Sequence, residues 1–354
     1  MARAMAEWLE SPLFWIGGVL IALVAHYVFW VWRLRRPLDY AEELRLPTAD
    51  GSAIVLRRIL PEGHGEGPPV LLVHGIAANH RNIDAEEHLS LARVIAASGR
   101  DTWLVTLRAG RGDRRFWEPV STLAMARQDL PLAVEYVCDR TESEVIDFVG
   151  FSMGGMLMLG ALPEALPVRR LRRAVFLAAP SRVITPLPAL QRLPIPLALL
   201  PPLPLRFVAR MAAFASEWFG TPLHGWVYNR KNTDRGSTAR ALVNLIEDVP
   251  LAVGRDFARW AQGDGTIDLE GTPLLTGLDE VRPIDALFIA GSADRVAPPA
   301  AVRAGYDAWA GAKEYRELGR AGGAGEDYGH GDLVIGKRAV QEVFEPIRDF
   351  LNRD

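Results

Sequence analysis

The sequence predicts an α/β fold in which a mostly parallel sheet is covered by helices on both faces. Short apolar runs at 70–73, 145–150 and 174–179 alternate with longer segments of helical periodicity. Continuous apolar strands are typical of parallel sheets that are buried on both faces. The alternation stops near residue 181, and an apolar strand pattern returns at 286–290. The chain has 354 residues and is 49% hydrophobic, which is enough for a large core.

The remaining elements are predicted from periodicity and turn residues. Residues 52–60 alternate like an edge strand. Residues 84–98 have a helical pattern that ends at Gly99. The arginine-rich segment 108–115 is interpreted as a solvated loop. The other predicted elements are a strand at 102–107 and helices at 123–138, 154–162 and 344–351.

Residues 13–32 form a run of twenty residues without a formal charge. A helix of that length spans the hydrocarbon core of a bilayer, and tryptophans near both ends of the run are typical of the membrane interface. A cleaved signal peptide is the competing interpretation. However, the run is long, no small-residue cleavage site follows it, and three arginines close it within 33–36. We therefore predict an uncleaved N-terminal membrane anchor, a transmembrane helix within residues 1–36.

The charges on either side of this run predict its orientation. Arg3 precedes the run and is offset by two glutamates, whereas Arg33, Arg35 and Arg36 follow it. Positively charged residues favour the cytoplasmic side of a membrane. The domain after the anchor is therefore expected in the cytoplasm.

The segment 150–154 has the pattern Gly-x-Ser-x-Gly between an apolar strand and an apolar helix. A serine at the tip of such a turn takes a strained backbone conformation. Glycines at positions 150 and 154 avoid the crowding that a Cβ would cause, and the first amides of the helix point towards whatever the serine attacks. Ser152 is therefore the candidate nucleophile. From this motif alone, the alternative is a chance match in which Ser152 only caps a helix.

A serine hydroxyl needs a base, and the base needs an orienting acid. Asp294 follows the apolar run 286–290, and His330 lies in a glycine-rich loop. Taken singly, they could be a turn aspartate and a surface histidine, but the chain order Ser, Asp, His is that of serine enzymes with this turn. Asp327 and Asp332 are too close to His330 along the chain to orient its ring from behind. We therefore expect Asp294 to be the acid and His330 the base.

Residues 181–280 interrupt the α/β alternation. Their first part, 186–205, holds seven prolines among leucine, isoleucine and alanine, which excludes a regular spanning helix. Such an apolar stretch predicts a lid over an apolar pocket or a membrane contact; the alternative is an insertion that only packs on the domain. The residues expected to face the pocket or the bilayer are Leu187, Leu190, Ile195 and Leu197. Helical patterns follow at 207–218, 239–247 and 251–261.

Composition excludes several classes of function. A net charge of −3 gives no electrostatic footprint for nucleic acid. Cys138 is the only cysteine, so the sequence predicts neither a disulfide framework nor a cysteine-based zinc site. The seven histidines show no metal-ligand spacing. We therefore predict no metal and no cofactor.

With this triad in this order, the chain resembles an α/β-hydrolase from about residue 45 to residue 354. The resemblance implies a hydrolase core at 45–180 and 281–354, with 181–280 as its helical, proline-rich cap. The segment 72–76 reads LVHGI and is similar to the oxyanion loop of the family. In that family, the amide after His-Gly and the amide after the nucleophile bind the oxyanion.

The resemblance therefore implies Ile76 and Met153 as the oxyanion donors, with His74 a loop-shaping residue rather than the base. Within the family, three features resemble the acid-lipase branch that includes gastric and lysosomal lipases. They are the segment 101–105 followed by Arg108 and Arg111, the segment 129–131, and the turn 149–155. The sequence departs from that branch at Ala109, where the branch has a glycine, and the cap has no spacing that matches.

These features predict a membrane-anchored serine hydrolase, an esterase or lipase that cleaves apolar, lipid-like esters through an acyl-enzyme. One alternative is an acyltransferase that passes the acyl group from the same triad to an alcohol or amine. Another is a non-catalytic, membrane-tethered interaction module, which the intact Ser, Asp and His argue against.

Overall fold

The computed structural model describes residues 11–353 except 64, 66, 116, 185–203, 219–223 and 235. The strands of its main sheet are β1 (Glu42–Pro47), β2 (Ala53–Ile59), β3 (Val70–Val73), β6 (Thr102–Thr106), β7 (Ile146–Phe151), β8 (Leu171–Leu177), β11 (Asp285–Gly291) and β12 (Lys313–Leu318). They lie in the order β1-β2-β6-β3-β7-β8-β11-β12. β2 is antiparallel to both of its neighbours, and every pair from β6 to β12 is parallel.

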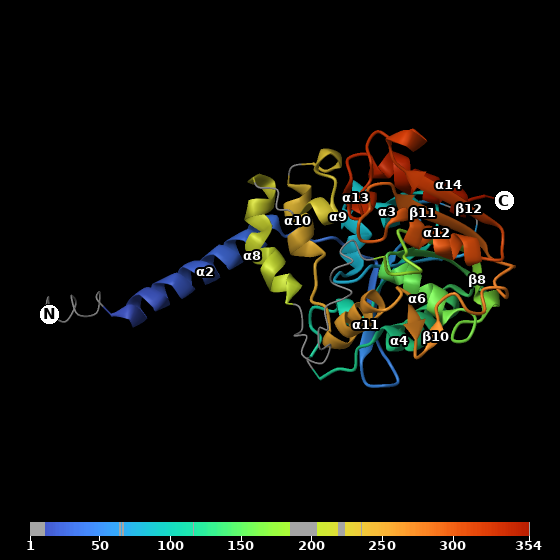
Figure 1. The fold of residues 1–354 in the computed structure, drawn as a ribbon, viewed down its shortest axis with the longest axis horizontal. Coiled ribbons are helices and arrows are strands. Elements are labelled where there is room, and N and C mark those ends of the chain that lie inside the picture. Colours follow the sequence, from blue (N-terminus) through green and yellow to red (C-terminus); the bar gives the residue numbers. More distant parts are fainter. Residues whose placement is uncertain are drawn as a thin grey trace.

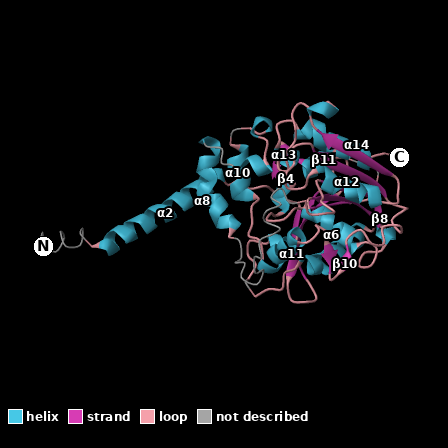
Figure 2. Cartoon of the chain, in the orientation of Figure 1, coloured by secondary structure: helices cyan, strands magenta, loops and turns pink. Residues whose placement is uncertain are grey.

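Helices pack around this sheet (Figure 2). Those of the core are α3 (Leu91–Ala97), α4 (Thr122–Ala124), α5 (Leu130–Thr141), α6 (Met153–Ala161), α12 (Pro299–Ala308), α13 (Asp332–Ile335) and α14 (Glu345–Leu351). Those between β8 and β11 are α8 (Leu205–Trp218), α9 (His224–Val227), α10 (Ser237–Asn244) and α11 (Leu251–Gln262), and α2 (Pro12–Leu34) precedes the core. Two short hairpins complete the described part of the chain: β4 (Asp84–Glu86) with β5 (Leu89–Ser90), and β9 (Asp268–Leu269) with β10 (Thr272–Pro273).

The central strands are where the sequence pattern placed them, and the predicted α/β fold with a mostly parallel sheet is confirmed. Every residue of β3, β6 and β7 is buried, because helices on both faces leave no solvent-facing side to a central parallel strand. Apolar residues are continuous along these strands for the same reason. Since the carboxyl ends of parallel strands meet at one rim, the loops after β3, β6, β7 and β11 open onto the same edge of the sheet.

The structure corrects the prediction for the helix at 84–98. Only Leu91–Ala97 is helical, and the residues before it form the hairpin β4–β5. Ser90 ends the hairpin and caps the helix, because its side chain accepts a hydrogen bond from the Arg93 amide. The apolar periodicity therefore begins within the hairpin, before the first residue of the helix.

The two edges of the sheet also differ from the prediction. The strand predicted at the edge, 52–60, is β2 and lies inside, whereas the edge strand is β1 with its alternating half-buried and exposed residues. At the other edge, β12 reads KEYREL and is half-buried along most of its length. Edge strands need few apolar residues, so neither β1 nor β12 shows the apolar run that marks the inner strands.

The helix predicted at 123–138 is continuous from α4 to α5 but contains one wide turn, at Met125–Asp129. A second wide turn, at Val340–Phe344, precedes α14. In both places a proline is the second residue of the α-helix that follows. A proline has no N–H and its ring crowds the carbonyl of the preceding turn, which accounts for the local widening.

Helix α2 projects from the domain, and its contacts with the described part of the domain are made through its C-terminal third (Figure 1). Among the described residues it is the one helix long and apolar enough to cross a membrane, a test that a signal sequence also passes. His26 lies against Met211 and Phe214 of α8, and Tyr27 stacks on Phe207 at 5.7 Å between ring centroids. The side chains before His26 are mostly exposed.

The end of α2 is held by α10 as well. Leu34 is buried together with Ala213 of α8 and with two α10 residues, Ala239 and Val243. The Asn244 side chain donates to the Leu34 carbonyl oxygen at 3.0 Å and accepts from the Arg36 amide at 3.0 Å. Helix α2 is therefore packed against the insertion between β8 and β11.

The lid proposed for residues 186–205 falls almost entirely outside the described residues. Leu187, Leu190, Ile195 and Leu197 all lie there, so their predicted orientation stays a prediction. The helices expected after that stretch, at 207–218, 239–247 and 251–261, correspond to α8, α10 and α11.

Candidate active site

Ser152 stands between β7 and α6 in a backbone conformation that ordinary residues avoid. Its φ is 52° and its ψ is −121°. Its amide donates to the Leu177 carbonyl oxygen of the neighbouring strand at 2.8 Å, which holds the turn against β8. A strained residue at a sharp strand-to-helix turn is the geometry that presents a nucleophile above the sheet.

The glycines on either side of Ser152 are required by close contacts. A Cβ on Gly154 would lie 2.5 Å from the Val73 carbonyl oxygen at the end of β3. A Cβ on Gly150 would lie 2.5 Å from the backbone of Gly155 in the first turn of α6. Both distances are below any real Cβ contact, so helix α6 can start this close to the sheet only with glycine at both positions.

The structure brings Ser152, His330 and Asp294 together in one hydrogen-bonded line. His330 Nε2 lies 2.9 Å from Ser152 Oγ, and His330 Nδ1 lies 2.7 Å from Asp294 Oδ2. All three side chains are buried, with between 3% and 7% of each residue exposed. They are separated by up to 178 positions in sequence. The arrangement can transfer a proton from the serine to the histidine while the carboxylate holds the ring in place.

Asp294 is itself fixed by the turn after β11. Its Oδ1 accepts hydrogen bonds from the Val296 and Ala297 amides, each at 2.8 Å. This leaves Oδ2 facing His330. A carboxylate with one oxygen bound to backbone and the other to the imidazole has little freedom to turn away.

The two nearer aspartates bind elsewhere, as expected. Asp332 accepts from the amides of Gly329 and Asn229, at 2.9 and 3.0 Å, and from the side chain of Asn232. Burial raises the pKa of Asp332 against those hydrogen bonds. Asp327 accepts from the Arg320 amide at 2.9 Å. Asp332 therefore shapes the loop that carries His330 and does not orient the ring.

His74 has the loop-shaping position that the resemblance implied. Its Nε2 accepts from the Leu107 amide at 3.1 Å, so its Nδ1 carries the proton and donates to the Gly75 carbonyl oxygen at 2.8 Å. Burial lowers the pKa of His74 to about 4. The ring is therefore neutral near pH 7, and both of its nitrogens are engaged.

The loop after β3 passes close to the nucleophile. A Cβ on Gly75 would lie 3.1 Å from the Cβ of Ser152, and the next residue along the loop is Ile76. Met153 is the first residue of α6, where an amide has no partner within the helix. The two amides assigned to an oxyanion hole thus belong to segments that flank Ser152 closely.

Sequence reasoning missed the two asparagines that hold this loop. Asn82 Oδ1 accepts a hydrogen bond from the Gly75 amide at 3.0 Å. This bond fixes the loop after β3, which lies seven residues before Asn82 in the chain. Asn79 caps the short 3-10 helix His80–Asn82 through the Arg81 amide and donates to Glu247 at 2.9 Å. Asparagine is a common cap residue, but only the fold shows which amides these side chains reach.

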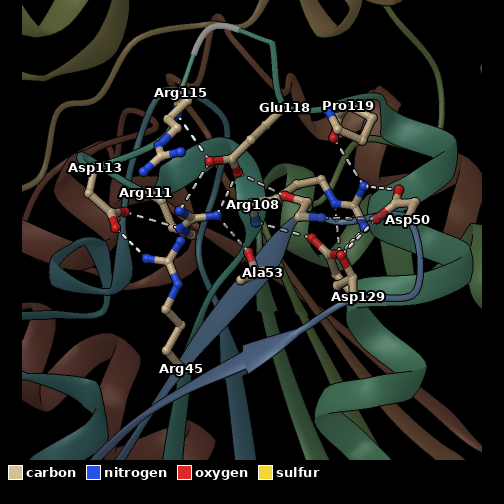
Figure 3. A network of polar contacts seen from close by, with 12 residues as sticks. Arg45, Asp50, Ala53, Arg108, Arg111, Asp113, Arg115, Glu118, Pro119 and Asp129 are labelled. Atoms are coloured by element: carbon tan, nitrogen blue, oxygen red, sulfur yellow. Dashed lines mark hydrogen bonds and ion pairs between the residues drawn. The ribbon is translucent and has the colours of Figure 1, made fainter.

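The arginines after β6 lie in a buried ionic network, so the prediction of a solvated loop is wrong for Arg108 and Arg111 (Figure 3). Arg108 donates to Asp129 through Nε at 2.8 Å and through its amide at 3.0 Å, and it also pairs with Asp50. Arg111 pairs with Glu118 at 2.7 Å. A buried guanidinium is tolerated when carboxylates surround it. Those carboxylates come from distant parts of the chain, which the local sequence does not show.

This network also explains two of the sequence features noted above. Arg108 and Asp129 were singled out separately as acid-lipase-like, and the structure shows that they bind each other. Their pair joins the loop after β6 to the wide turn before α5. The described residues hold no cluster of three or more His, Cys, Asp or Glu side chains that could bind a metal ion.

Comparison with known proteins identifies relatives of this arrangement. A family model described as alpha/beta hydrolase fold matches residues 68–323. Lipase member M of Homo sapiens is 31% identical over 35% of this chain and 33% of its own length. Lysosomal acid lipase/cholesteryl ester hydrolase of Homo sapiens is 30% identical over 35% of this chain and 36% of its own. The chain therefore spans about a third of the length of the curated relatives that it matches, and the resemblance to acid lipases is confirmed.

Two solved structures show the same fold. A thermophilic esterase from Thermogutta terrifontis superposes with a TM-score of 0.55 and 16% identity, and covers 88% of this chain and 100% of its own. A membrane phospholipase A, described as a bacterial virulence factor, has a TM-score of 0.53 and 15% identity, and the match covers 100% of both chains.

Proposed function

Because the family model matches more than half of its length, the chain belongs to the α/β-hydrolase fold family, and we propose that it is a membrane-anchored serine hydrolase. It cleaves carboxylic esters of apolar, lipid-like substrates through an acyl-enzyme. The observation that carries this proposal is the hydrogen-bonded line from Ser152 through His330 to Asp294 at the carboxyl rim of the sheet.

The geometry supports a two-step mechanism. Ser152 Oγ attacks the ester carbonyl carbon as its proton passes to His330 Nε2, and Asp294 stabilises the imidazolium that forms. The negative oxygen of the tetrahedral intermediate accepts hydrogen bonds from the amides of Ile76 and Met153. The intermediate collapses, and the alcohol leaves with the proton from His330. Water then attacks the acyl-serine with the same base, which releases the acid and regenerates Ser152.

The membrane part of the proposal rests on α2. Its side chains before His26 are largely exposed and apolar, and a helix of that kind is unstable in water unless lipid covers it. The membrane phospholipase A structure, unlike the esterase, matches over the whole of this chain, including α2. The arginines at 33–36 favour a cytoplasmic domain.

Packing of α2 on the insertion determines where the anchor can be cut. Residues from His26 onward contact α8 and α10, so removal of residues 1–36 would expose apolar surface on the domain. Removal of residues 1–25 keeps that contact. The full-length protein is expected to stay in the membrane fraction when membranes are washed with alkaline carbonate. The chain lacking residues 1–25 is expected to be released by the same wash. Full-length protein that fractionates as soluble without detergent would refute the anchor. Export of a reporter fused after Asp354 would contradict the proposed cytoplasmic location of the domain.

The substrate proposal is tested with esters of increasing acyl length. Each methylene buried in an apolar site contributes about 0.8 kcal/mol, so medium or long acyl esters are expected to have a higher kcat/KM than acetates. Ser152→Ala is the control for chemistry by this site. A preference for acetate would contradict a lipid-like substrate while leaving the serine mechanism in place.

Two further readouts separate the competing functions. Labelling by a fluorophosphonate probe is expected for wild type and not for Ser152→Ala, and its absence in both would favour a non-catalytic module. Added alcohols are expected to leave the release of free acid as the main reaction. Transfer of the acyl group to the alcohol as the dominant product would instead make the protein an acyltransferase.

A further inference from the structure

A cavity of about 390 Å³ lies where the end of α2 meets α8, α10 and the β1–β2 edge of the sheet. Its lining contains none of Ser152, His330 and Asp294. The lining is rich in guanidinium groups, which come from segments that are distant in sequence: Arg35, Arg36, Arg57, Arg81, Arg206 and Arg210. Such a concentration of positive charge around one cavity needs an explanation, because like charges repel.

Carboxylates from the protein neutralise only part of this charge. The acidic residues of the lining are Glu43 and Glu247. Glu43 pairs with Arg57 at 2.9 Å, and Glu247 lies 3.5 Å from Arg206. The other four guanidinium groups have no carboxylate within ion-pair distance among the residues that the structure describes.

The side-chain hydrogen bonds of Arg36, Arg81 and Arg210 go to neutral oxygens. Arg81 is buried and donates to three backbone carbonyls, two of them on Asp84 and Ala85. Arg210 donates to the Val243 carbonyl and to the Tyr27 hydroxyl at 3.3 Å. These bonds position the guanidinium groups, which have no directly paired carboxylate among the described residues.

His80 also lines the cavity, and its pKa lies well below the ordinary value, first because of burial and then because of Arg57 and Arg81. In the lining of the cavity, six guanidinium groups face two carboxylates. This contrasts with the network in Figure 3, where Arg108 and Arg111 are matched by four nearby carboxylates, those of Asp50, Asp113, Glu118 and Asp129.

The position of the cavity indicates the kind of anion. It begins where the charge-free part of α2 ends, and Val31 of that helix forms part of its wall. On α8, Phe207 and Val208 are more than half exposed and lie between Arg206 and Arg210 in sequence. A ligand in the cavity would therefore have apolar helix surface beside it, at the level where a spanning helix leaves the hydrocarbon.

We propose that this cavity binds the phosphate of an anionic phospholipid, with the acyl chains lying along α2 and α8. Guanidinium groups bind phosphate oxygens through paired, charge-assisted hydrogen bonds. Four arginines without a paired carboxylate among the described residues also disfavour a headgroup that carries its own cation, such as choline. The inference rests on the membrane placement of α2 in the proposed function, and is independent of ester cleavage.

Binding is measured with the full-length Ser152→Ala protein in micelles of a neutral detergent, so that no probe lipid can be hydrolysed. Calorimetric titrations use dioctanoyl phosphatidylglycerol, dioctanoyl phosphatidylcholine and inorganic phosphate. Phosphatidylglycerol is expected to bind about tenfold more tightly than either of the others. Equal binding of the two lipids would overturn the proposal, and equal binding of inorganic phosphate would assign the cavity to a soluble phosphate compound instead.

A matched pair of variants tests whether the cavity itself is responsible. Arg33 lies in the last turn of α2 and Arg35 is its C-cap residue. Arg35→Gln and Arg33→Gln remove the same charge, and both side chains are exposed, but only Arg35 lines the cavity. Loss of one charge-assisted contact is expected to weaken binding about tenfold in Arg35→Gln and less than about threefold in Arg33→Gln. Arg210→Gln is expected to behave like Arg35→Gln. Equal losses in Arg33→Gln and Arg35→Gln would show diffuse attraction to anionic surfaces and no defined site. Because no turnover is measured, a failure here is distinct from a failure of the hydrolase proposal.

Discussion

Strand β7 carries a buried polar residue at each end, and the two have different partners. Asp147 is the second residue of the strand, and Ser152 follows its last residue. Asp147 accepts hydrogen bonds from the side chains of Arg100 and Arg172 and from the amide of Arg173. Ser152 Oγ has a single side-chain partner, His330, among the described residues.

The difference lies in what each set of partners permits. At the amino end, two guanidinium groups surround one carboxylate, and Arg100, Arg172 and Arg173 also donate to the carbonyl oxygen of Leu351. That cluster ties the C-terminal helix to the sheet and leaves no group free to react. At the carboxyl end, a neutral hydroxyl faces an imidazole that can take up its proton. Both ends are buried, so burial of a polar residue does not reveal its role, whereas the chemistry of its partners does.

The largest effect is expected from Ser152→Ala. Removal of the nucleophile should lower kcat/KM by about 10^6-fold, by analogy with other triads, while the free energy of unfolding changes by less than about 1 kcal/mol because only one oxygen is lost. Ser181 is a matched control, since it is also a buried serine after a strand but donates to the Ala301 carbonyl. Ser181→Ala should keep its activity. Ester hydrolysis and chemical denaturation measure the two quantities, and more than a few per cent of residual activity in Ser152→Ala would refute its role.

The next largest effect is expected at the far end of the triad. Asp294→Asn should lower kcat by about 10^4-fold, because an amide in place of the carboxylate neither holds the correct tautomer nor stabilises an imidazolium. Asp327→Asn removes a carboxylate that is nearer to His330 in sequence but bonded to Arg320 and Ser292, and it should change kcat less than about threefold. If the two variants were equally active, Asp294 would not be the triad acid.

Asp147→Ala should show the opposite pattern, with lost stability and retained chemistry. Arg100 is only 1% exposed, and a buried guanidinium without its carboxylate costs about 3 to 5 kcal/mol. Asp285 begins the parallel strand β11 but is exposed, so Asp285→Ala should cost less than about 0.5 kcal/mol. Denaturant unfolding gives these values, and activity per folded molecule should stay near wild type. A loss of kcat at full folding would remove the distinction between the two ends of β7.

The smallest effect concerns pH and the oxyanion loop. The pKa of His74 is about 4 in the folded protein and about 6.5 when unfolded. Below pH 6.5 the unfolded chain therefore binds a proton that the folded protein does not, and stability is lost as the pH falls from 6.5 through 4. Between about pH 7.5 and pH 4.5 this amounts to about 2 to 3 kcal/mol.

The control for that prediction is His74→Asn, which should be less stable at pH 7.5 but lose less stability on acidification. Unfolding curves at several pH values test this. Because burial also lowers the pKa of His80, part of the pH dependence should remain in the variant. An unchanged slope in His74→Asn would show that His74 is not the group that titrates.

Much of the candidate site could be predicted because its signals are local. The pattern at 150–154 needs glycines for contacts within one turn, and an apolar run before Asp294 places it after a strand. The order of Ser152, Asp294 and His330 along the chain then indicated that they act as nucleophile, acid and base. The structure brings these three side chains together. The central strands were predictable for a similar reason, since burial on both faces requires an unbroken apolar run.

The errors fall where residues act through partners that are distant in sequence. Arg108 and Arg111 belong to an arginine-rich segment that reads as a surface loop, yet Asp50 and Asp129 make a buried position possible for Arg108. The helix predicted at 84–98 begins only at Leu91 in the structure. The residues before Leu91 form a hairpin, which has no strong signal in the sequence. Strands β1 and β12 were not predicted, because an edge strand tolerates a polar sequence and so lacks an apolar run.

The sequence by itself therefore determined the α/β alternation, the candidate residues Ser152, Asp294 and His330 that the fold brings together, and the apolar length of the N-terminal helix. Each of these depends on periodicity or on contacts within a few residues. Only the tertiary structure decided which charges are paired. Asp147 and Arg108 find opposite charges across the fold, while Arg35, Arg36 and Arg210 line one cavity beside α2 without a directly paired carboxylate among the described residues. Electrostatic energy depends on distance in space, and no local pattern in the chain specifies which distant side chains folding will bring together.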